Sequence, residues 1–235
     1  MPSVNTITAS GYQTTKDGKK VLLVPANGAC RATCTSVKWE LVKDPSEPLA
    51  FDIEFQEYKG PDAEKWAHRI GRIAVVNTRG EVVLDTFTQY DFDRNVKTKM
   101  PPPQFGVTRM DLWLRNGAKK WWVVEENLYK LFHDRMIIGH GTRLDRIAVG
   151  EAVWGEEHTN GSMFYDTQNS YGRVKLCTLA ADHLPGMTFS FHDPTDDARV
   201  AMLLYLRKNP FKGRNSFEDA PLGGKDKYDE HFPAL

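Results

Sequence analysis

The sequence has no net excess of charge, because its 31 lysine and arginine residues balance its 31 aspartate and glutamate residues. A protein with this balance has no general attraction for polyanions. A nucleic-acid partner would therefore have to be held by a local groove or by metal ions. This lack counts against a protein that coats nucleic acids in bulk, and it leaves open an enzyme that acts on them.

Long apolar runs and a cysteine framework are also missing. No stretch approaches the roughly 18 uninterrupted apolar residues of a membrane span, and the first 20 residues lack the apolar core of a secretory signal. The three cysteines, Cys30, Cys34 and Cys177, are an odd number without framework spacing. Cys30 and Cys34 could form half of a zinc site, but no second ligand pair follows nearby. We therefore expect a protein of the nucleus or cytoplasm with no membrane partner.

The composition is that of an ordinary globular domain, with 40% hydrophobic and 26% charged residues. Turn-forming residues at 43–48 mark the point where the main domain begins. The last segment is rich in proline, glycine and charge, which is typical of a loosely packed tail. We predict a variable N-terminal extension over 1–46, one domain over 47–208 and a C-terminal tail over 209–235.

The order of secondary structure indicates an α/β fold with a mixed sheet flanked by helices. Short strand-like pieces, including 36–42, precede the domain. Three consecutive antiparallel strands follow, and the prolines of 100–107 exclude regular structure there. Apolar residues at helical spacing predict a helix at 123–135, with Val124, Leu128, Leu131 and Phe132 facing the core. The other predicted elements are strands at 49–55, 68–78, 81–90 and 136–140, helices at 144–154, 174–184 and 194–208, and a strand followed by a loop at 162–171.

The stretch FDIEF, residues 51–55, places two carboxylates on one face of a strand. Side chains two residues apart point the same way, so Asp52 and Glu54 lie together. Burying two unpaired carboxylates is costly, and a cation between them would offset that cost. Oxygen ligands favour Mg²⁺ or Mn²⁺. The alternative is an edge strand with a solvated polar face.

Two further stretches place acids at the starts of helices. In GHGTRLD, Thr142 and Asp145 form a capping pattern, and an acid near a helix N-terminus is favoured by the helix dipole. In HDPTDDA, Asp193 can cap the helix that Pro194 begins. Neither His192 nor Asp197 is needed for that cap.

These three stretches, DIE, GHxxxxD and HxxxxDA, resemble the exonuclease motifs of the DEDDh superfamily in the same order. The residues in and around these motifs are most similar to those of the branch of RNA exonuclease 4 and the interferon-stimulated exonucleases. The phrases LAFDIEF, Gly106-Val107-Thr108, IIGHGTRLDRIAV, Tyr165-Asp166-Thr167 and HDPTDDARVAMLLY carry this resemblance, which covers about residues 48–208.

The resemblance implies a ribonuclease H-like fold and a two-metal hydrolysis of phosphodiesters. It assigns metal binding to Asp52, Glu54, Asp145 and Asp197, and the role of general base to His192. Two Mg²⁺ or Mn²⁺ ions roughly 4 Å apart can activate water, relieve phosphoryl charge and stabilise the leaving oxygen. The usual pKa of histidine, about 6.5, suits the removal of a proton from water near neutrality.

The resemblance further implies that the substrate is contacted at Ile53, Phe55, His140 and Arg143. His140 could equally be a core or capping histidine. Phe55 stands where the branch usually has methionine, which leaves base stacking open. The insertion GPDAEKWAH and the prolines of MPPPQF also depart from the branch, so we expect a remodelled substrate rim.

Other residues have two interpretations. Arg143, Arg146 and Arg199 could contact phosphates or be solvated charges on a helix. The adjacent Trp121 and Trp122 could stack on bases or pack against the protein.

The predicted function is that of a 3′–5′ exoribonuclease that releases nucleoside monophosphates from single-stranded RNA, with single-stranded DNA as a further substrate. The alternative is a catalytically silent module of the same fold that binds nucleic acid or protein.

Overall fold

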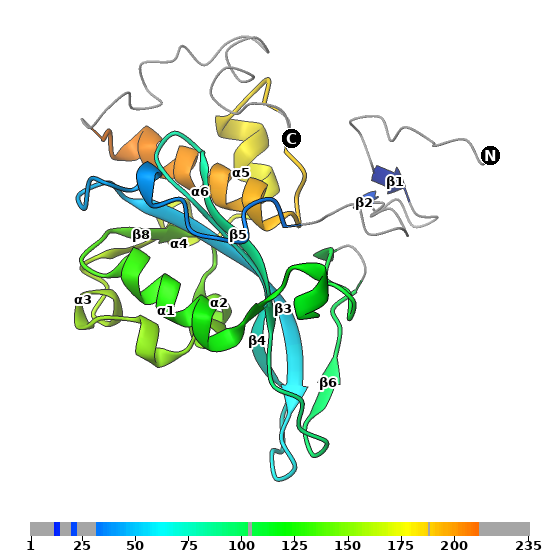
Figure 1. Ribbon diagram of the computed structural model, residues 1–235. Coiled ribbons are helices and arrows are strands. Elements are labelled where there is room, and N and C mark those ends of the chain that lie inside the picture. The colour runs from blue at the N-terminus through cyan, green and yellow to red at the C-terminus, as the bar shows by residue number, and fades with distance from the viewer. Residues whose placement is uncertain (1–11, 15–19, 23–31, 103–104, 188, 212–235) are drawn as a thin grey trace, which may run out of the picture.

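The computed structural model describes residues 12–14, 20–22, 32–102, 105–187 and 189–211 of the chain. Strands β1 (Tyr12–Thr14) and β2 (Lys20–Leu22) pair with each other in antiparallel register. The remaining described residues build one mixed sheet with helices on both faces (Figure 1).

The sheet has the strand order β7-β5-β4-β3-β8-β9, and β6 pairs with the far end of β3. The predicted run of three consecutive antiparallel strands is confirmed in β3, β4 and β5. The pairs β3–β8, β8–β9 and β5–β7 are parallel. The bounds are Leu49–Lys59 for β3, Ala67–Val76 for β4, Val82–Gln89 for β5, Lys97–Lys99 for β6, Lys119–Lys120 for β7, Ile137–Gly139 for β8 and Phe164–Asp166 for β9.

Helices cover the two faces of this sheet, with α5 and α6 on one side and α1 and α2 on the other (Figure 1). Alternation along β3 divides the core accordingly. Phe51 and Ile53 pack in the cluster that contains α1, whereas Ala50 packs in the cluster that contains α6. The bounds are Trp121–Phe132 for α1, Arg143–Val149 for α2, Glu156–Thr159 for α3, Thr167–Ser170 for α4, Leu176–His183 for α5 and Pro194–Lys208 for α6.

The helix at 123–135 is confirmed as α1, and it buries the four residues predicted to face the core. Two other segments differ from prediction. The helix predicted at 144–154 is interrupted at Gly150, whose φ of 92° is in the left-handed region and ends α2 before a short 3₁₀ turn, Glu151–Val153. The loop predicted after Asp166 contains the short helix α4, which the Asp166 side chain caps.

The N-terminal segment, by which we mean residues 32–48, packs on the sheet. The strand-like piece predicted at 36–42 is instead a 3₁₀ turn, Trp39–Leu41, followed by the buried Val42. Cys34 is also buried and forms a backbone bridge with Asp85 of β5. Whether residue 46 marks a domain boundary stays a prediction, and Cys30 lies outside the described residues.

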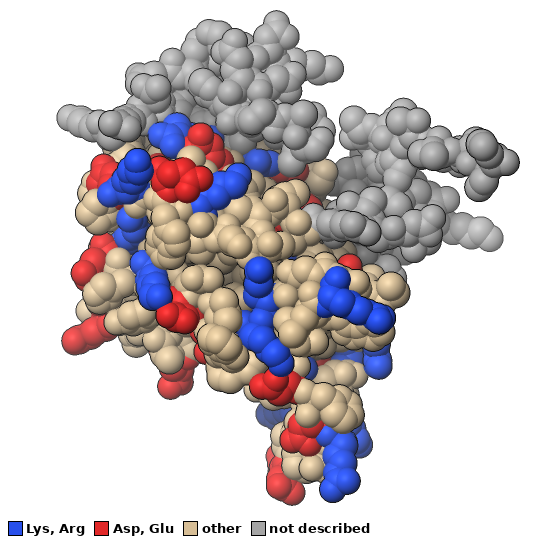
Figure 2. All heavy atoms as spheres, viewed as in Figure 1, with Lys and Arg blue, Asp and Glu red and all other residues tan. Residues whose placement is uncertain are grey.

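Among the described residues, no helix has the length and apolarity needed to span a membrane. Lysine and arginine side chains alternate with aspartate and glutamate side chains over the face shown in Figure 2, which agrees with the balanced composition.

Candidate active site

The strand acids lie on the face of β3 that meets α6. Asp52 and Glu54 alternate with core residues and share the face of Ala50, which packs against α6. A β-bulge between Glu54 and Phe55 breaks the pairing with β4 at this point. Gly71 of β4 allows the close approach, since an added Cβ would lie 2.8 Å from the Glu54 carbonyl oxygen. Bulges of this kind change the direction in which a side chain points next to a site.

Asp145 comes from the first turn of α2 and is 7% exposed. The predicted cap by Thr142 is wrong, because its side chain makes no capping hydrogen bond. The Thr142 hydroxyl instead donates to Asp166 Oδ2 at 3.4 Å, and Asp166 Oδ1 accepts from Gly141 N at 3.0 Å. Asp166, at the end of β9, thus ties down the turn that leads into α2.

His192 and Asp197 are placed by the start of α6. As predicted, Asp193 caps this helix by accepting from Thr195 N at 2.9 Å, and Pro194 occupies the first turn. His192 has a φ of 70°, a left-handed conformation that is strained for a residue with a side chain. Its backbone N–H donates to Asp197 Oδ2 at 3.0 Å, which fixes the turn against the helix.

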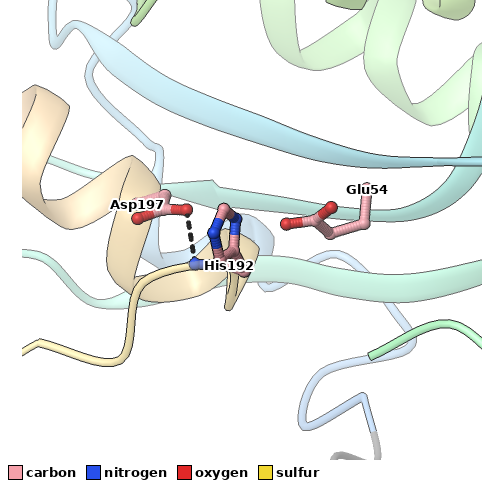
Figure 3. Close-up of side chains that lie close together, drawn as sticks. All are labelled: Glu54, His192 and Asp197. Atoms are coloured by element: carbon pink, nitrogen blue, oxygen red, sulfur yellow. Dashed lines mark hydrogen bonds between the residues drawn. The ribbon is translucent and has the colours of Figure 1, made fainter. Parts of the chain in front are cut away.

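The structure brings the strand and helix groups together (Figure 3). One ligand atom each from Glu54, His192 and Asp197 lie within 4.8 Å of one another. Asp52 and Asp145 lie outside this tightest group but are coupled to it: the charge of Asp145 raises the pKa of Glu54, and the charges of Asp197 and Glu54 raise the pKa of Asp52. We call Asp52, Glu54, Asp145 and Asp197 the acid cluster; their roles as metal ligands stay predictions.

Burial and mutual repulsion govern the protonation of the acid cluster. Burial, followed by the charges of Asp197 and Asp145, raises the pKa of Glu54 to about 10 and that of Asp52 well above its usual value. Burial also raises the pKa of Asp145 to about 7 and that of Asp197 well above its usual range. In the metal-free protein these carboxylates therefore resist ionising together.

The acid cluster fits a site for divalent cations. Asp197 Oδ1 is buried and has no hydrogen-bond partner among the described residues, although a buried oxygen normally has one. Carboxylate oxygens from three distant segments converge beside it. Oxygen donors without sulfur are the set that Mg²⁺ and Mn²⁺ prefer.

His192 supplies the cluster with a nitrogen base. It is partly exposed, and desolvation by the surrounding protein lowers the pKa of its imidazole, so the neutral form is favoured at neutral pH. The Phe105 ring packs edge-on against it, with 4.7 Å between the ring centroids. The segment 100–107, in which the sequence departs from the related branch, therefore reaches the site.

The predicted substrate residues occupy different environments. Ile53 is 4% exposed in the core, so only its backbone could meet a substrate. Phe55 is partly buried and stacks on His68 at 4.9 Å between ring centroids. His140 Nδ1 is bonded to Thr167 Oγ1 at 2.9 Å, while its buried Nε2 has no partner within the described part of the chain. Arg143 is exposed and lines a cleft of about 960 Å³ beside α2.

The arginines and tryptophans for which the sequence allowed two interpretations also occupy different environments. Arg146 donates to the His158 carbonyl at 2.9 Å, and Arg199 donates to the Gly80 carbonyl and to Asp196, so both arginines have structural partners. Trp121 packs parallel to Tyr90, whereas Trp122 is 53% exposed.

Arg72 of β4 is a site residue that the sequence pattern did not reveal. It is 3% exposed, lies opposite Glu54 in the β3–β4 register, and its charge lowers the pKa of Glu54. In the sequence it looks like any polar position of an alternating strand. No local signal distinguishes it.

The fold and the sequence of this chain can be compared with those of known proteins. No model of a protein family matches it. In fold it is similar to the Saccharomyces cerevisiae Pan2 pseudoubiquitin hydrolase-RNA exonuclease module in complex with AAUUAA RNA, with a TM-score of 0.58 and 18% identity over 86% of this chain and 35% of that one. The Neurospora crassa Pan2 catalytic unit gives a TM-score of 0.58 and 20% identity over 84% of this chain and 32% of that one. The predicted ribonuclease H-like α/β fold is confirmed.

In sequence, the chain is similar to RNA exonuclease 4 from two strains of Cryptococcus neoformans var. neoformans serotype D. The identity is 30% over 178 residues, which cover 71% of this chain and 39% of the relative. The chain therefore spans about two fifths of the length of these relatives. The chain is thus similar in sequence to an RNA exonuclease and in fold to the Pan2 modules.

Proposed function

We propose that the chain is a metal-dependent 3′–5′ exonuclease that hydrolyses single-stranded RNA to nucleoside monophosphates. The observation that carries this proposal is the convergence of four carboxylates from β3, α2 and α6, three of them buried, beside one histidine. A fold does not need such an arrangement for stability, because unpaired buried acids oppose folding.

RNA is the favoured substrate because of the relatives. RNA exonuclease 4 is named for it, and the similar Pan2 module was solved with RNA bound. We extend this preference to the present chain. Single-stranded DNA is the second substrate to test.

Within this proposal, Asp52, Glu54, Asp145 and Asp197 hold two Mg²⁺ or Mn²⁺ ions. When bound, such ions activate water and neutralise charge that develops on the phosphate. An unprotonated imidazole nitrogen of His192 accepts the proton of the attacking water, and its lowered pKa keeps that nitrogen free at neutral pH. The packing of Phe105 shields one side of the imidazole from bulk water.

The remaining predicted residues would position the RNA. Arg143 is an exposed cation at the start of α2, two residues from Asp145, and suits a backbone phosphate. His140 would contact a substrate oxygen only if its buried Nε2 became exposed. Phe55 offers a ring face next to Glu54, although its stacking on His68 limits its movement.

The test is incubation of the purified protein with 5′-labelled single-stranded RNA and Mg²⁺ or Mn²⁺. The expected result is a ladder that shortens from the 3′ end, is abolished by EDTA, and yields nucleoside monophosphates. A second RNA with a 3′-terminal phosphate should be degraded more slowly, because an enzyme of this direction engages the free 3′ end.

A DNA oligonucleotide of the same sequence measures the dependence on the 2′-hydroxyl. The variant Asp52→Asn provides the matched control, since it keeps the side-chain volume and removes the charge. If neither metal produces a ladder while RNA is still bound, the chain is a binding module and the proposal is wrong.

A further inference from the structure

A network of buried polar groups ends beside His192. Arg72 donates through Nε and Nη2 to the two oxygens of Asp85, at 2.8 and 2.9 Å, and through Nη1 to Asp193 Oδ2 at 3.1 Å. Asp85 is fully buried and also accepts from the backbone N–H and the hydroxyl of Thr33, at 2.7 and 2.9 Å. The network thus joins the N-terminal segment, β5, β4 and the turn before α6.

Asp193 is oriented by two partners. Its Oδ1 accepts from Thr195 N, and its Oδ2 accepts from Arg72. Both oxygens of this carboxylate accept hydrogen bonds, and Asp193 lies close enough to raise the pKa values of Glu54 and Asp52. Asp193 therefore differs from the four members of the acid cluster.

The strained conformation of His192 explains what the hydrogen bond between Arg72 and Asp193 does. A left-handed φ of 70° is strained in a residue with a side chain and persists only when its surroundings hold it. Asp197 holds the turn at the His192 N–H, and Arg72 holds it one residue later at Asp193. Two anchors on consecutive residues fix the direction in which the imidazole leaves the backbone.

We propose that Arg72 and Asp193 are positioning residues that hold the His192 imidazole against Glu54 and Asp197, with Asp85 and Thr33 supporting Arg72. This inference deepens the proposed function and rests on it for the role of His192. The N-terminal segment then contributes to catalysis through Thr33, without touching the substrate.

Arg72 itself is a poor first target. Its removal would leave the buried Asp85 without a countercharge, which is strongly destabilising and endangers folding. Asp193→Ser is the sharper variant. Serine is a good helix cap and can still accept from Thr195 N, but it is too short to reach Arg72.

For Asp193→Ser we expect kcat to fall by about ten- to a hundredfold, because a catalytic group displaced by about 1 Å loses that much rate. KM should be unchanged, and the affinity for Mn²⁺ measured by calorimetry should fall much less than in Asp52→Ala, because Asp193 contributes only a nearby charge. In the metal-free protein, the imidazole nitrogen NMR signals of His192 should shift and broaden. Those of His158, a buried histidine bonded to the Arg135 carbonyl, provide the internal reference.

Thr33→Val, which removes one hydrogen bond to Asp85, should cause a smaller change in the same direction. Arg135→Met controls for stability, since it removes a buried arginine whose bonds run to carbonyls of the N-terminal segment. It should leave kcat per folded molecule unchanged.

An unchanged kcat and unchanged His192 signals in folded Asp193→Ser would show an ion pair with a purely structural role. A loss of Mn²⁺ affinity as large as that caused by Asp52→Ala would make Asp193 a metal ligand. Either result overturns the positioning role. If the wild-type protein has no nuclease activity, the proposed function fails, but the NMR comparison still decides whether Arg72 and Asp193 hold the imidazole.

Discussion

The acid cluster and the surroundings of Arg135 are both buried and charged, but they differ in their partners. Arg135 is 8% exposed and donates to the carbonyls of Val42, Asp44 and Glu47. The nearby Glu47 carboxylate accepts from the Thr78 backbone and hydroxyl. In the acid cluster, carboxylates face one another, and one buried oxygen of Asp197 lacks a partner among the described residues.

The comparison separates two uses of a buried charge. Around Arg135, each charge is matched by hydrogen bonds, so it stabilises the junction between the N-terminal segment and the sheet. In the acid cluster, repulsion between like charges is retained and opposes folding, which is expected where a cation binds. Arg72 shares features of both groups. It donates hydrogen bonds to Asp85 and Asp193, and it also lies next to the acid cluster.

The largest expected effect follows from Asp52→Ala. Removal of this carboxylate should abolish turnover of RNA, while thermal unfolding in EDTA shows an unchanged or higher stability, because one source of repulsion is gone. Glu126→Gln, which removes an exposed acid paired with Lys130 on α1, should change neither property. A marked loss of stability in Asp52→Ala would show that Asp52 stabilises the fold, as Arg135 does.

Arg135→Met should lower stability without affecting catalysis, which is the reverse of the result expected for Asp52→Ala. Three carbonyls lose their charged donor, and we expect the free energy of unfolding to fall by about 3–5 kcal/mol, the usual range for one partner removed from a buried charged site. The rate per folded molecule should remain that of the wild type. Urea titration and single-turnover kinetics measure the two quantities, and a fall in the rate alone would break the comparison.

A third expected effect is the pH dependence of the metal-free protein. The pKa of Asp145 rises to about 7 on folding and that of Glu54 to about 10, so the folded state holds protons that the unfolded state has released. Stability in EDTA should therefore fall as pH increases from about 4 to about 7, and more gradually beyond.

Saturating Mn²⁺ should reverse this trend, because metal binding favours the ionised acids. Melting curves at several pH values, with and without the metal, measure the effect. Equal slopes in both conditions would show that the acids are not coupled to a cation.

Much of the architecture could be predicted because the local signals were strong. The apolar spacing of Val124, Leu128 and Leu131 can be satisfied by one helix face, and Asp193-Pro194 marks the start of α6 through cap chemistry. The failures have a common cause. Thr142 did not cap α2 because Asp166, 24 residues later, accepts its hydrogen bonds.

The sequence by itself determined the order of the strands and helices, the pairing of Asp52 with Glu54 on one strand face, and the acids at the helix starts, because each depends on neighbours a few residues apart. Only the tertiary structure decided which acids remain unpaired and which are neutralised. Asp193 and Asp197 look alike in the sequence, yet one meets Arg72, 121 residues away, and the other meets Glu54 and His192. Desolvation and ion pairing depend on contacts across the sheet, and no local pattern encodes them.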